Sequence, residues 1–275
     1  MEEAKAFLKN LIHATDSKNK IFIRNILKEY LQAHVLDFVY SHPKYSQLVF
    51  YGGSCLAHCH GLPRLSEDLD FIDLRGEIEI RKFAKDVQMF FKKNTDLNIS
   101  ANVQKFRVYL KFPILHELGV THGSETDLLF LKVEIFQDFK HCSKYAIDTI
   151  PIFKFNKSIL VKTFDLPTLM STKIRAVLYR KWEKKSASGK ILAKVKGRDY
   201  FDLMWYLEKA VKPNLGCIVG IESLEALKAK LLKIVDTVDA RSIQYDLEAL
   251  IDNENFIKNL SKNIKEILKR KISAL

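Results

Sequence analysis

The chain has 275 residues, of which 47% are hydrophobic, and a formal net charge of +12. This length and composition are sufficient for one or two packed domains. No apolar run approaches the roughly 18 to 20 residues that a membrane span needs, and the start lacks a basic region followed by an apolar core. Four cysteines in this length do not suggest a disulfide framework. The composition therefore predicts a cytoplasmic protein with reduced thiols and no membrane partner.

The positive charge is concentrated in the second part of the chain. Residues 1–150 contain 20 Lys and Arg against 19 Asp and Glu, whereas residues 151–275 contain 25 against 14. Such a basic cluster is typical of a protein that binds nucleic acid, although a solvated, lysine-rich surface has the same composition. The residues predicted to contact nucleic acid are Arg180, Lys181, Lys184, Lys185, Lys190, Lys194, Lys196 and Arg198.

Apolar periodicity and turn signals predict the secondary structure of the first part. A residue before proline avoids the α region, so a helix over 19–41 ends before His42-Pro43. The other helices are expected at 3–15, 54–60 and 77–93. Strands are expected at 47–51, 69–73, 97–105, 107–112, 128–136, 150–154 and 158–163.

The pattern becomes helical after residue 164. Asp165 is expected to cap a helix that has Pro167 in its first turn. Helices are predicted at 167–185, 198–210, 221–236, 240–250 and 252–272. We therefore expect an α+β fold in which a mixed sheet flanked by helices occupies residues 1–164. A helical, basic domain would then occupy residues 165–275.

Two aspartates follow a glycine turn. Asp68 and Asp70 project to the same side of a strand, because side chains alternate along it. Two carboxylates 4 Å apart repel each other by about 1 kcal/mol in water, so the pair needs a cation. Oxygen ligands suit Mg²⁺ bound with nucleotide phosphates, and Gly52 and Gly53 let a phosphate approach the backbone. The pattern predicts metal-dependent phosphoryl chemistry on a nucleoside triphosphate.

A third carboxylate would complete a two-metal site. Glu134 is the preferred candidate, since it shares one strand face with Lys132 beside the predicted 69–73 strand. The alternative is a surface glutamate paired with a neighbouring lysine. Asp127 and Asp138 are weaker candidates.

A basic and an acidic pair occur in the helical region. Lys173 and Arg180 are seven residues apart, hence on one face of the predicted 167–185 helix, where they could neutralise phosphate oxygens. Asp199 and Asp202 share a face of the next helix, although acids in a first turn also complement the helix dipole.

A short cysteine and histidine cluster lies in the predicted 54–60 helix. The spacing of Cys55, His58, Cys59 and His60 does not match a usual zinc site. We expect the cysteines to pack inward.

The motifs together resemble a known family. Gly52-Gly-Ser54, followed by Arg64-x-Ser66-Glu67-Asp68-Leu-Asp70, is similar to the signature of AbiEii/AbiGii-type nucleotidyltransferases. These are toxins of type IV toxin–antitoxin and abortive-infection (phage defence) systems, in the DNA polymerase β-like superfamily. The later segments agree in order: Lys132-x-Glu134, Thr172-Lys173-x-Arg175 through Arg180, and Arg198-Asp199-x-x-Asp202.

The resemblance implies a polymerase β-like sheet with a helical C-terminal domain. It also implies Mg²⁺-dependent transfer of an NMP from an NTP such as ATP, through two metal ions, with Mn²⁺ as an alternative. Some members are similar to MenT toxins, which add nucleotides to the tRNA 3′ end and block aminoacylation. The acceptor would then be RNA, with tRNA preferred, and an antitoxin partner is expected. A protein or small-molecule acceptor, such as an aminoglycoside, and a catalytically idle nucleotide- or RNA-binding protein are the alternatives.

The resemblance also implies roles for individual residues. The metal ligands would be Asp68, Asp70 and Glu134, and the further catalytic residues Lys173 and Asp202. One departure is Glu134, where many superfamily members have Asp. The nucleotide-binding residues would be Gly52, Gly53, Ser54, Arg64, Ser66, Lys173 and Arg180, and the basic cluster from Arg180 to Arg198 would bind RNA.

Overall fold

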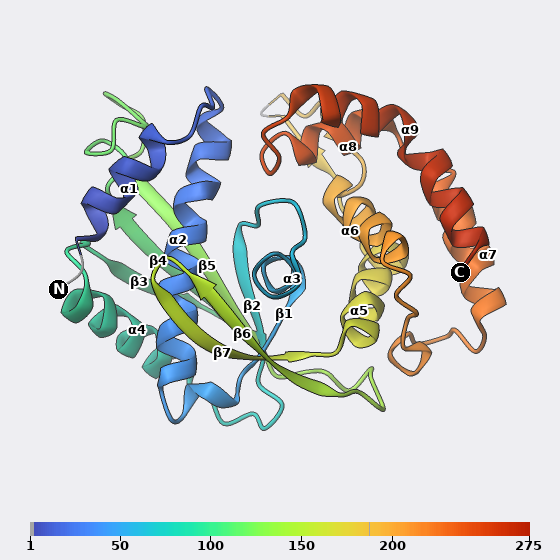
Figure 1. Cartoon of the computed structure of the whole chain (residues 1–275), viewed down its shortest axis with the longest axis horizontal. Helices are drawn as coiled ribbons and strands as arrows, with labels where there is room; N and C mark the ends of the chain where they lie inside the picture. The colour runs from blue at the N-terminus through green and yellow to red at the C-terminus, as the bar shows by residue number, and fades with distance from the viewer. Residues whose placement is uncertain (1–2, 187) are drawn as a thin grey trace. The chain divides into compact units, whose positions relative to one another are not determined.

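The computed structural model describes residues 3–186 and 188–275. The chain forms two compact units (Figure 1). The first comprises Met1–Phe139 and Ile147–Thr163, and the second comprises Lys140–Ala146 and Phe164–Leu275. The first contains a mixed sheet with helices and the second is mostly helical, so the predicted α+β class is confirmed.

A seven-stranded sheet organises the first unit, with the strand order β3-β4-β5-β2-β1-β7-β6. Strand β2 lies near its centre, antiparallel to β1 and parallel to β5. Strand β4 is antiparallel to both β3 and β5, while β1 and β7 are parallel. The strands are β1 Val49–Tyr51, β2 Asp68–Ile72, β3 Ser100–Gln104, β4 Arg107–Pro113, β5 Leu128–Phe136, β6 Ile147–Lys154 and β7 Lys157–Phe164.

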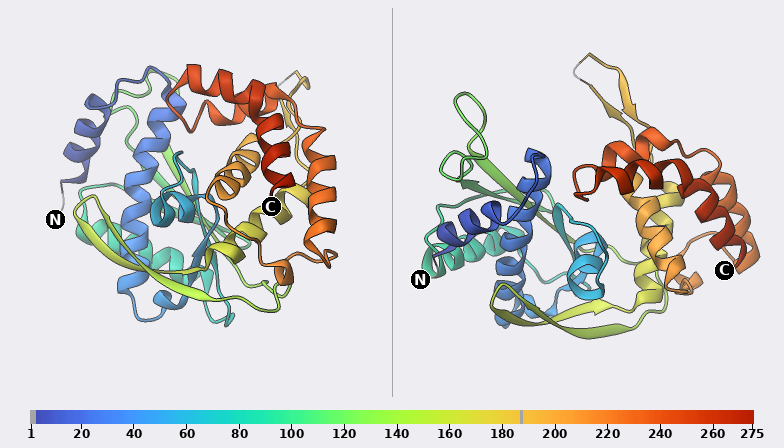
Figure 2. Two further views of the ribbon diagram at one scale, coloured as in Figure 1. Left: turned by 45° about the vertical axis from the view of Figure 1, so that its right-hand side comes forward. Right: turned by 45° about the horizontal axis from the view of Figure 1, so that its top comes forward.

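Helices cover one face of this sheet (Figures 1 and 2). The long helix α2 packs against β5, and α4 packs against β3 and β4. Alternate residues of the strands, such as Leu69, Phe71 and Val133, are fully buried in this core. The intervening residues point to the opposite face, which places Asp68 and Asp70 there together. The helices are α1 Ala4–His13, α2 Lys20–Ser41, α3 Gly52–His60 and α4 Ile80–Asn94, with a short 3₁₀ turn at Tyr45–Gln47.

Helix α6 is central to the second unit and packs against α5, α8 and α9. Helix α5 begins as predicted, since the Asp165 side chain accepts a hydrogen bond from the Thr168 N–H and Pro167 lies in the first turn. The elements are α5 Leu166–Tyr179, β8 Lys184–Lys185, β9 Ile191–Ala193, α6 Gly197–Glu208, a 3₁₀ turn at Leu215–Cys217, α7 Leu224–Val235, α8 Ala240–Leu247 and α9 Glu254–Ser273.

The helix predicted over residues 167–185 is too long. It ends at Tyr179, because the Arg180 backbone is extended and its side chain turns to an aspartate of α6. The basic segment that follows forms an antiparallel pair of short strands, β8 and β9. The small residues Ser186 to Gly189 predict a loop between these strands, and Ala187 of that stretch lies outside the described residues.

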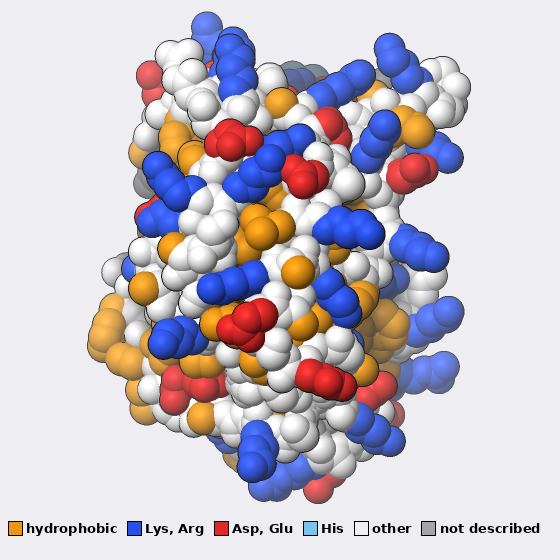
Figure 3. Space-filling view, turned by 90° about the vertical axis from the view of Figure 1, so that its right-hand side faces the viewer, with side chains coloured by type: hydrophobic (Ala, Val, Ile, Leu, Met, Phe, Trp, Pro, Cys, Tyr) orange, Lys and Arg blue, Asp and Glu red, His pale blue; other side chains and the backbone are white. Residues whose placement is uncertain are grey.

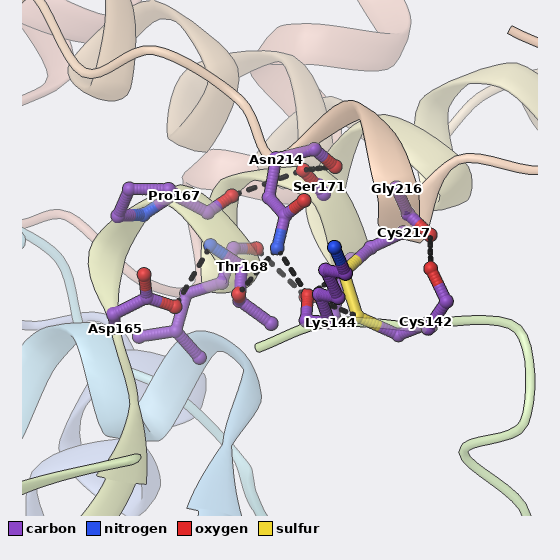
Figure 4. The surroundings of a disulfide bond; sticks show 12 residues. Cys142, Lys144, Asp165, Pro167, Thr168, Ser171, Asn214, Gly216 and Cys217 are labelled. Carbon is purple, nitrogen blue, oxygen red and sulfur yellow. Dashed lines mark hydrogen bonds between the residues drawn. A yellow bond between two sulfur atoms is a disulfide. The ribbon is translucent and has the colours of Figure 1, made fainter. Parts of the chain in front are cut away.

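A disulfide holds residues 140–146 to the second unit. Cys142 and Cys217 are bonded across 75 residues of sequence (Figure 4). Nearby, the Asn214 side chain donates to the Lys144 carbonyl oxygen at 2.6 Å. The predicted reduced thiols are therefore wrong for this pair, while Cys55 and Cys59 are free. The same contacts explain why residues 140–146, which the predicted boundary assigned to the first domain, belong to the second unit.

None of the helices in the described part of the chain is both long and apolar enough to cross a membrane.

We expect iodoacetamide to modify only Cys55 and Cys59 when the protein is unfolded without reductant. The other two sulfurs are joined in the disulfide, so they should react only after reduction. Intact-mass spectrometry counts the added groups, and modification of all four cysteines without reductant would contradict the disulfide. Cys142→Ser should also lower the free energy of unfolding by about 2–5 kcal/mol, whereas Cys59→Ser serves as the control.

Candidate active site

The carboxylates of the first motif lie on the exposed face of strand β2. Asp70 is opposite Tyr51 of β1 on one side and Glu134 of β5 on the other. Asp68 is opposite Lys132 of β5. The strand register therefore brings together the three carboxylates predicted from the sequence, together with one lysine.

The glycine turn between β1 and α3 fits closely against this strand. Gly52 has a φ of +83°, and a Cβ atom there would lie 2.5 Å from Oδ2 of Asp70. A Cβ atom on Gly53 would lie 2.7 Å from Nη2 of Arg64 and 3.1 Å from Oγ of Ser66. A side chain at either position would collide with the polar groups of the motif, and only glycine adopts the Gly52 conformation easily.

Hydrogen bonds fix the turn to the strand from inside. The Ser54 hydroxyl donates to the Asp68 carbonyl oxygen, and Ser54 is fully buried. Arg64 is also buried, and its Nη1 donates to the Leu65 carbonyl oxygen at 2.7 Å. Because the Ser54 hydroxyl is already used, the groups suited to a phosphate are the backbone N–H groups of the first turn of α3.

Two cations neutralise the carboxylates. The Lys132 Nζ lies 2.9 Å from Oδ2 of Asp68 and 3.0 Å from Oε1 of Glu134. Arg107 of β4 donates from Nε to the same Glu134 oxygen at 2.6 Å. Partial burial alone would lower the pKa of Lys132, but the two carboxylates outweigh it and raise this pKa. Lys132 is therefore a permanent positive charge within the acidic site.

The carboxylates of β2 have the chemistry that a divalent cation prefers in its ligands. Asp68 and Asp70 present hard oxygen atoms from one strand face, and Asp68 already binds an ammonium group there. Glu134 instead forms the lysine pairing that was the alternative interpretation of its sequence, so its role as a third metal ligand stays a prediction. Within the described residues, no group of three or more His, Cys, Asp or Glu side chains is arranged to hold a metal ion.

The predicted residues of the second unit form a buried ion-pair network. The Lys173 Nζ lies 2.8 Å from Oδ1 of Asp199 and 2.8 Å from Oδ2 of Asp202. Arg180 reaches Oδ2 of Asp199 at 2.7 Å. The Asp202 side chain is fully buried, and that of Asp199 is 5% exposed.

Asp199 is a member of this network to which the sequence analysis assigned no role. Burial would raise its pKa, but Lys173 and Arg180 outweigh burial and hold that pKa below its usual value. Its sequence signals were its spacing of three residues from Asp202, which places both on one face of a helix, and its place in the Arg198-Asp199-x-x-Asp202 segment. The roles implied for Lys173 and Asp202 stay predictions.

Some side chains of the basic cluster contact neighbouring residues, and others are exposed to solvent. Arg180 pairs with Asp199, and the Arg198 Nε lies 3.8 Å from Oδ2 of Asp246. Lys196 lies over the Trp182 ring, and burial together with Arg198 and Arg180 lowers its pKa. The exposed members are Lys181, Lys184, Lys185, Lys190 and Lys194. Figure 3 shows that one face of the molecule carries many Lys and Arg side chains with fewer acidic groups between them.

The cysteine and histidine cluster packs into the first unit. Cys55 is fully buried, with its Sγ 3.0 Å from Oγ1 of Thr163. The His58 Nε2 lies 3.0 Å from Oε1 of Gln32. Burial, with a smaller effect from Lys154, lowers the pKa of His58 to about 3, so this ring is neutral. These contacts agree with a packing role.

The family of the chain follows from a comparison of its sequence with protein-family models. The model described as "Nucleotidyl transferase AbiEii toxin, Type IV TA system" matches residues 37–273. The chain belongs to the AbiEii family. It is accordingly a nucleotidyltransferase, as the motifs predicted. The AbiEii family also implies a nucleotide substrate and an antitoxin partner.

The fold of this chain is similar to that of a solved nucleotidyltransferase structure. MenT4, the nucleotidyltransferase toxin Rv2826c from Mycobacterium tuberculosis H37Rv, is similar with a TM-score of 0.57 and 11% sequence identity, over 98% of this chain and 90% of that chain. JHP933 from Helicobacter pylori has a TM-score of 0.47 and 16% identity, over 90% of this chain and 92% of that chain. The likeness to MenT4 shows the fold alone. No curated protein matches the sequence.

We expect Gly52→Ala to abolish nucleotide transfer, because the new methyl group would displace the Asp70 carboxylate. The matched control is Gly61→Ala at the other end of α3, since Gly61 has a φ of +71° but no atom within 4 Å of its Cβ position. Both variants should lose about 1–2 kcal/mol of stability from backbone strain. Thermal melting and transfer assays separate the two effects, and equal activity in both variants would contradict the role of this contact.

Asp199→Asn should lower the free energy of unfolding by about 3–5 kcal/mol, because it leaves Lys173 and Arg180 without their shared carboxylate. Asp236→Asn is the control, since Asp236 pairs with Lys269 at an exposed site and should change nothing measurable. The pKa of Asp199 is lowered in the folded protein, so its contribution is present above about pH 4. It disappears as the pH falls through the folded-state pKa. Urea denaturation at several pH values measures both effects.

Proposed function

We propose that this AbiEii protein transfers an NMP from an NTP to an RNA acceptor, the 3′ end of tRNA, and thereby blocks translation. In this reaction a 3′-hydroxyl oxygen bonds to the α-phosphorus, and the bond to pyrophosphate breaks. The observation that carries the proposal is the placement of Asp68 and Asp70 on one exposed strand face directly beside the Gly52-Gly53 turn. The turn that would bind the phosphate and the carboxylates that would bind the metal ion thus come from adjacent elements.

The glycine turn is suited to the triphosphate. Arg64 and Ser66 occupy the space where a Gly53 side chain would lie. A phosphate would therefore be bound by the first-turn N–H groups of α3, at the positive end of the helix dipole. Arg64 is buried and lies against Gly53. These groups would bind and orient the nucleotide before transfer.

Asp68 and Asp70 would hold the Mg²⁺ ion that accompanies the nucleotide. Bound there, the ion would supply positive charge to the phosphoryl oxygens and promote loss of a proton from the attacking hydroxyl. Ser54 fixes the backbone of Asp68, and Gly52 leaves space for the Asp70 carboxylate. The chain therefore controls the position of both ligands.

An RNA acceptor is supported by the charge of the second unit. Its residues include 24 Lys and Arg against 14 Asp and Glu, whereas the first unit has 21 against 19. Five lysines of the basic cluster are exposed and available to a polyanion. Binding through such lysines weakens steeply with salt, because RNA releases its counterions on binding.

We expect Asp70→Asn to reduce nucleotide transfer by about 10²- to 10³-fold, because the variant lacks a charged ligand at the reacting phosphate. The purified protein is incubated with each α-³²P-labelled NTP, Mg²⁺ and total cellular RNA, and the products are separated on a denaturing gel. Label should enter the tRNA band with one or two of the four nucleotides. Asp148→Asn, an exposed aspartate on strand β6, is the matched control and should remain active.

The other outcomes of this assay are equally informative. A fully active Asp70→Asn variant would remove Asp70 from the mechanism. Label on a protein or a small molecule, but not on RNA, would replace the proposed acceptor. Nucleotide binding with no label on any acceptor would indicate an idle binding protein.

A further inference from the structure

An open hollow lies on the face of the sheet that carries the carboxylates. It has a volume of about 420 Å³, which is within the range of roughly 300–1,000 Å³ typical of small-ligand sites. Strands β3, β4 and β5 of the first unit form it, and the proposed chemistry of the carboxylates and the glycine turn does not use it. Its lining residues are Asn102, Val103, Gln104, Tyr109, Lys111 and Phe130.

The strand register connects this hollow directly to the carboxylates. Asp68 is opposite Lys132, which is opposite Tyr109, which in turn is opposite Asn102. Side chains at paired positions project from the same face of a sheet. Neighbouring strands are about 4.8 Å apart, so Tyr109 lies roughly 10 Å from the strand of Asp68.

The lining combines an aromatic ring, a cation and amide groups. Phe130 is 41% exposed although it lies within a strand of the sheet. The Lys111 Nζ is 5.8 Å from the centre of the Phe130 ring. In the side-chain orientation in which both the oxygen and the nitrogen of its amide form hydrogen bonds, Asn102 accepts one from the Lys111 Nζ at 3.1 Å. An exposed ring stacks on a nucleobase, a lysine contacts the phosphate, and amides contact the edge of the base.

We propose that this hollow binds a nucleobase of the acceptor RNA strand, close to its reacting end. The proposal rests on the proposed function and adds a subsite for the acceptor to it. In phosphoryl transfer the attacking hydroxyl and the leaving pyrophosphate lie on opposite sides of the reacting phosphorus. Strand β2 lies between β1, whose end forms the glycine turn for the triphosphate, and β5, which leads to the hollow. The hollow is thus on the acceptor side of the carboxylates.

The hollow itself carries a cation, Lys111, beside the Phe130 ring. Arg107 and Lys132 project from β4 and β5 on the same face, where they pair with Glu134 and Asp68. The phosphates of a strand whose end reaches Asp70 would pass over these cations. A single-stranded RNA end presents both an unpaired base for Phe130 and this row of phosphates.

Phe130→Ala tests the proposal because the side chain is already partly exposed and its loss should leave the fold intact. Transfer of labelled NMP to purified total tRNA is measured while the tRNA and NTP concentrations are varied in turn. We expect the KM for tRNA to rise by about 5-fold or more, with little change in the KM for NTP. Phe130→Tyr keeps the ring and should return the KM for tRNA to near the wild-type value.

Phe153→Ala is the matched control. Phe153 is 78% exposed on strand β6, at the other edge of the same sheet, and its loss should not change the KM for tRNA. An unchanged KM for tRNA in Phe130→Ala, an equal change in Phe153→Ala, or a rise in the KM for NTP instead would overturn the subsite. In each of these outcomes the wild-type protein still labels tRNA. Failure of the wild-type protein to label RNA would overturn the proposed function, and the subsite with it.

Discussion

Two carboxylates on one face of a central strand require positive charge beside them, and the first unit is arranged around this requirement. Asp68 and Asp70 cannot separate, because they share the pleat of β2 between β1 and β5. Lys132 of the adjoining strand β5 supplies compensating charge to Asp68, and Arg107 of β4 does the same for Glu134. Such a pair of acids destabilises the folded chain unless a cation lies beside it, which explains why Lys132 projects from the position opposite Asp68.

The second unit also has two neighbouring carboxylates, and there the acids and their lysine partner are buried together. Lys173 pairs with both Asp199 and Asp202. Arg180, which directly follows α5, pairs with the second carboxylate oxygen of Asp199. Breaking such a network is costly because it leaves charges without partners in a region that excludes water. The exposed part of the basic cluster, by contrast, comes from lysines on and beside the β8–β9 hairpin, where little folding energy depends on them. Within one basic segment, some side chains are therefore held in ion pairs while others remain exposed.

The sequence predicts elements defined by local spacing better than those defined by distant contacts. Alternation placed Asp68 and Asp70 on one face, and motif order led to the family. The end of the helix before Arg180 was not predictable from periodicity, since it depends on a contact with Asp199, 19 residues away. The bond between Cys142 and Cys217 was missed for the same reason, because spacing along the chain contains no information about which cysteines meet in space.

The short segment Lys140–Ala146 has a consequence for how the protein can be divided. It belongs to the second unit, but it interrupts the sequence of the first between β5 and β6. The chain therefore passes from one unit to the other three times, and no single cut separates them. A fragment that begins at residue 165 would lack one half of the disulfide and the Lys144 carbonyl that accepts a hydrogen bond from Asn214. During evolution or in engineering, neither unit could be exchanged as an independent cassette, and variation must instead occur within the two units as a joined pair.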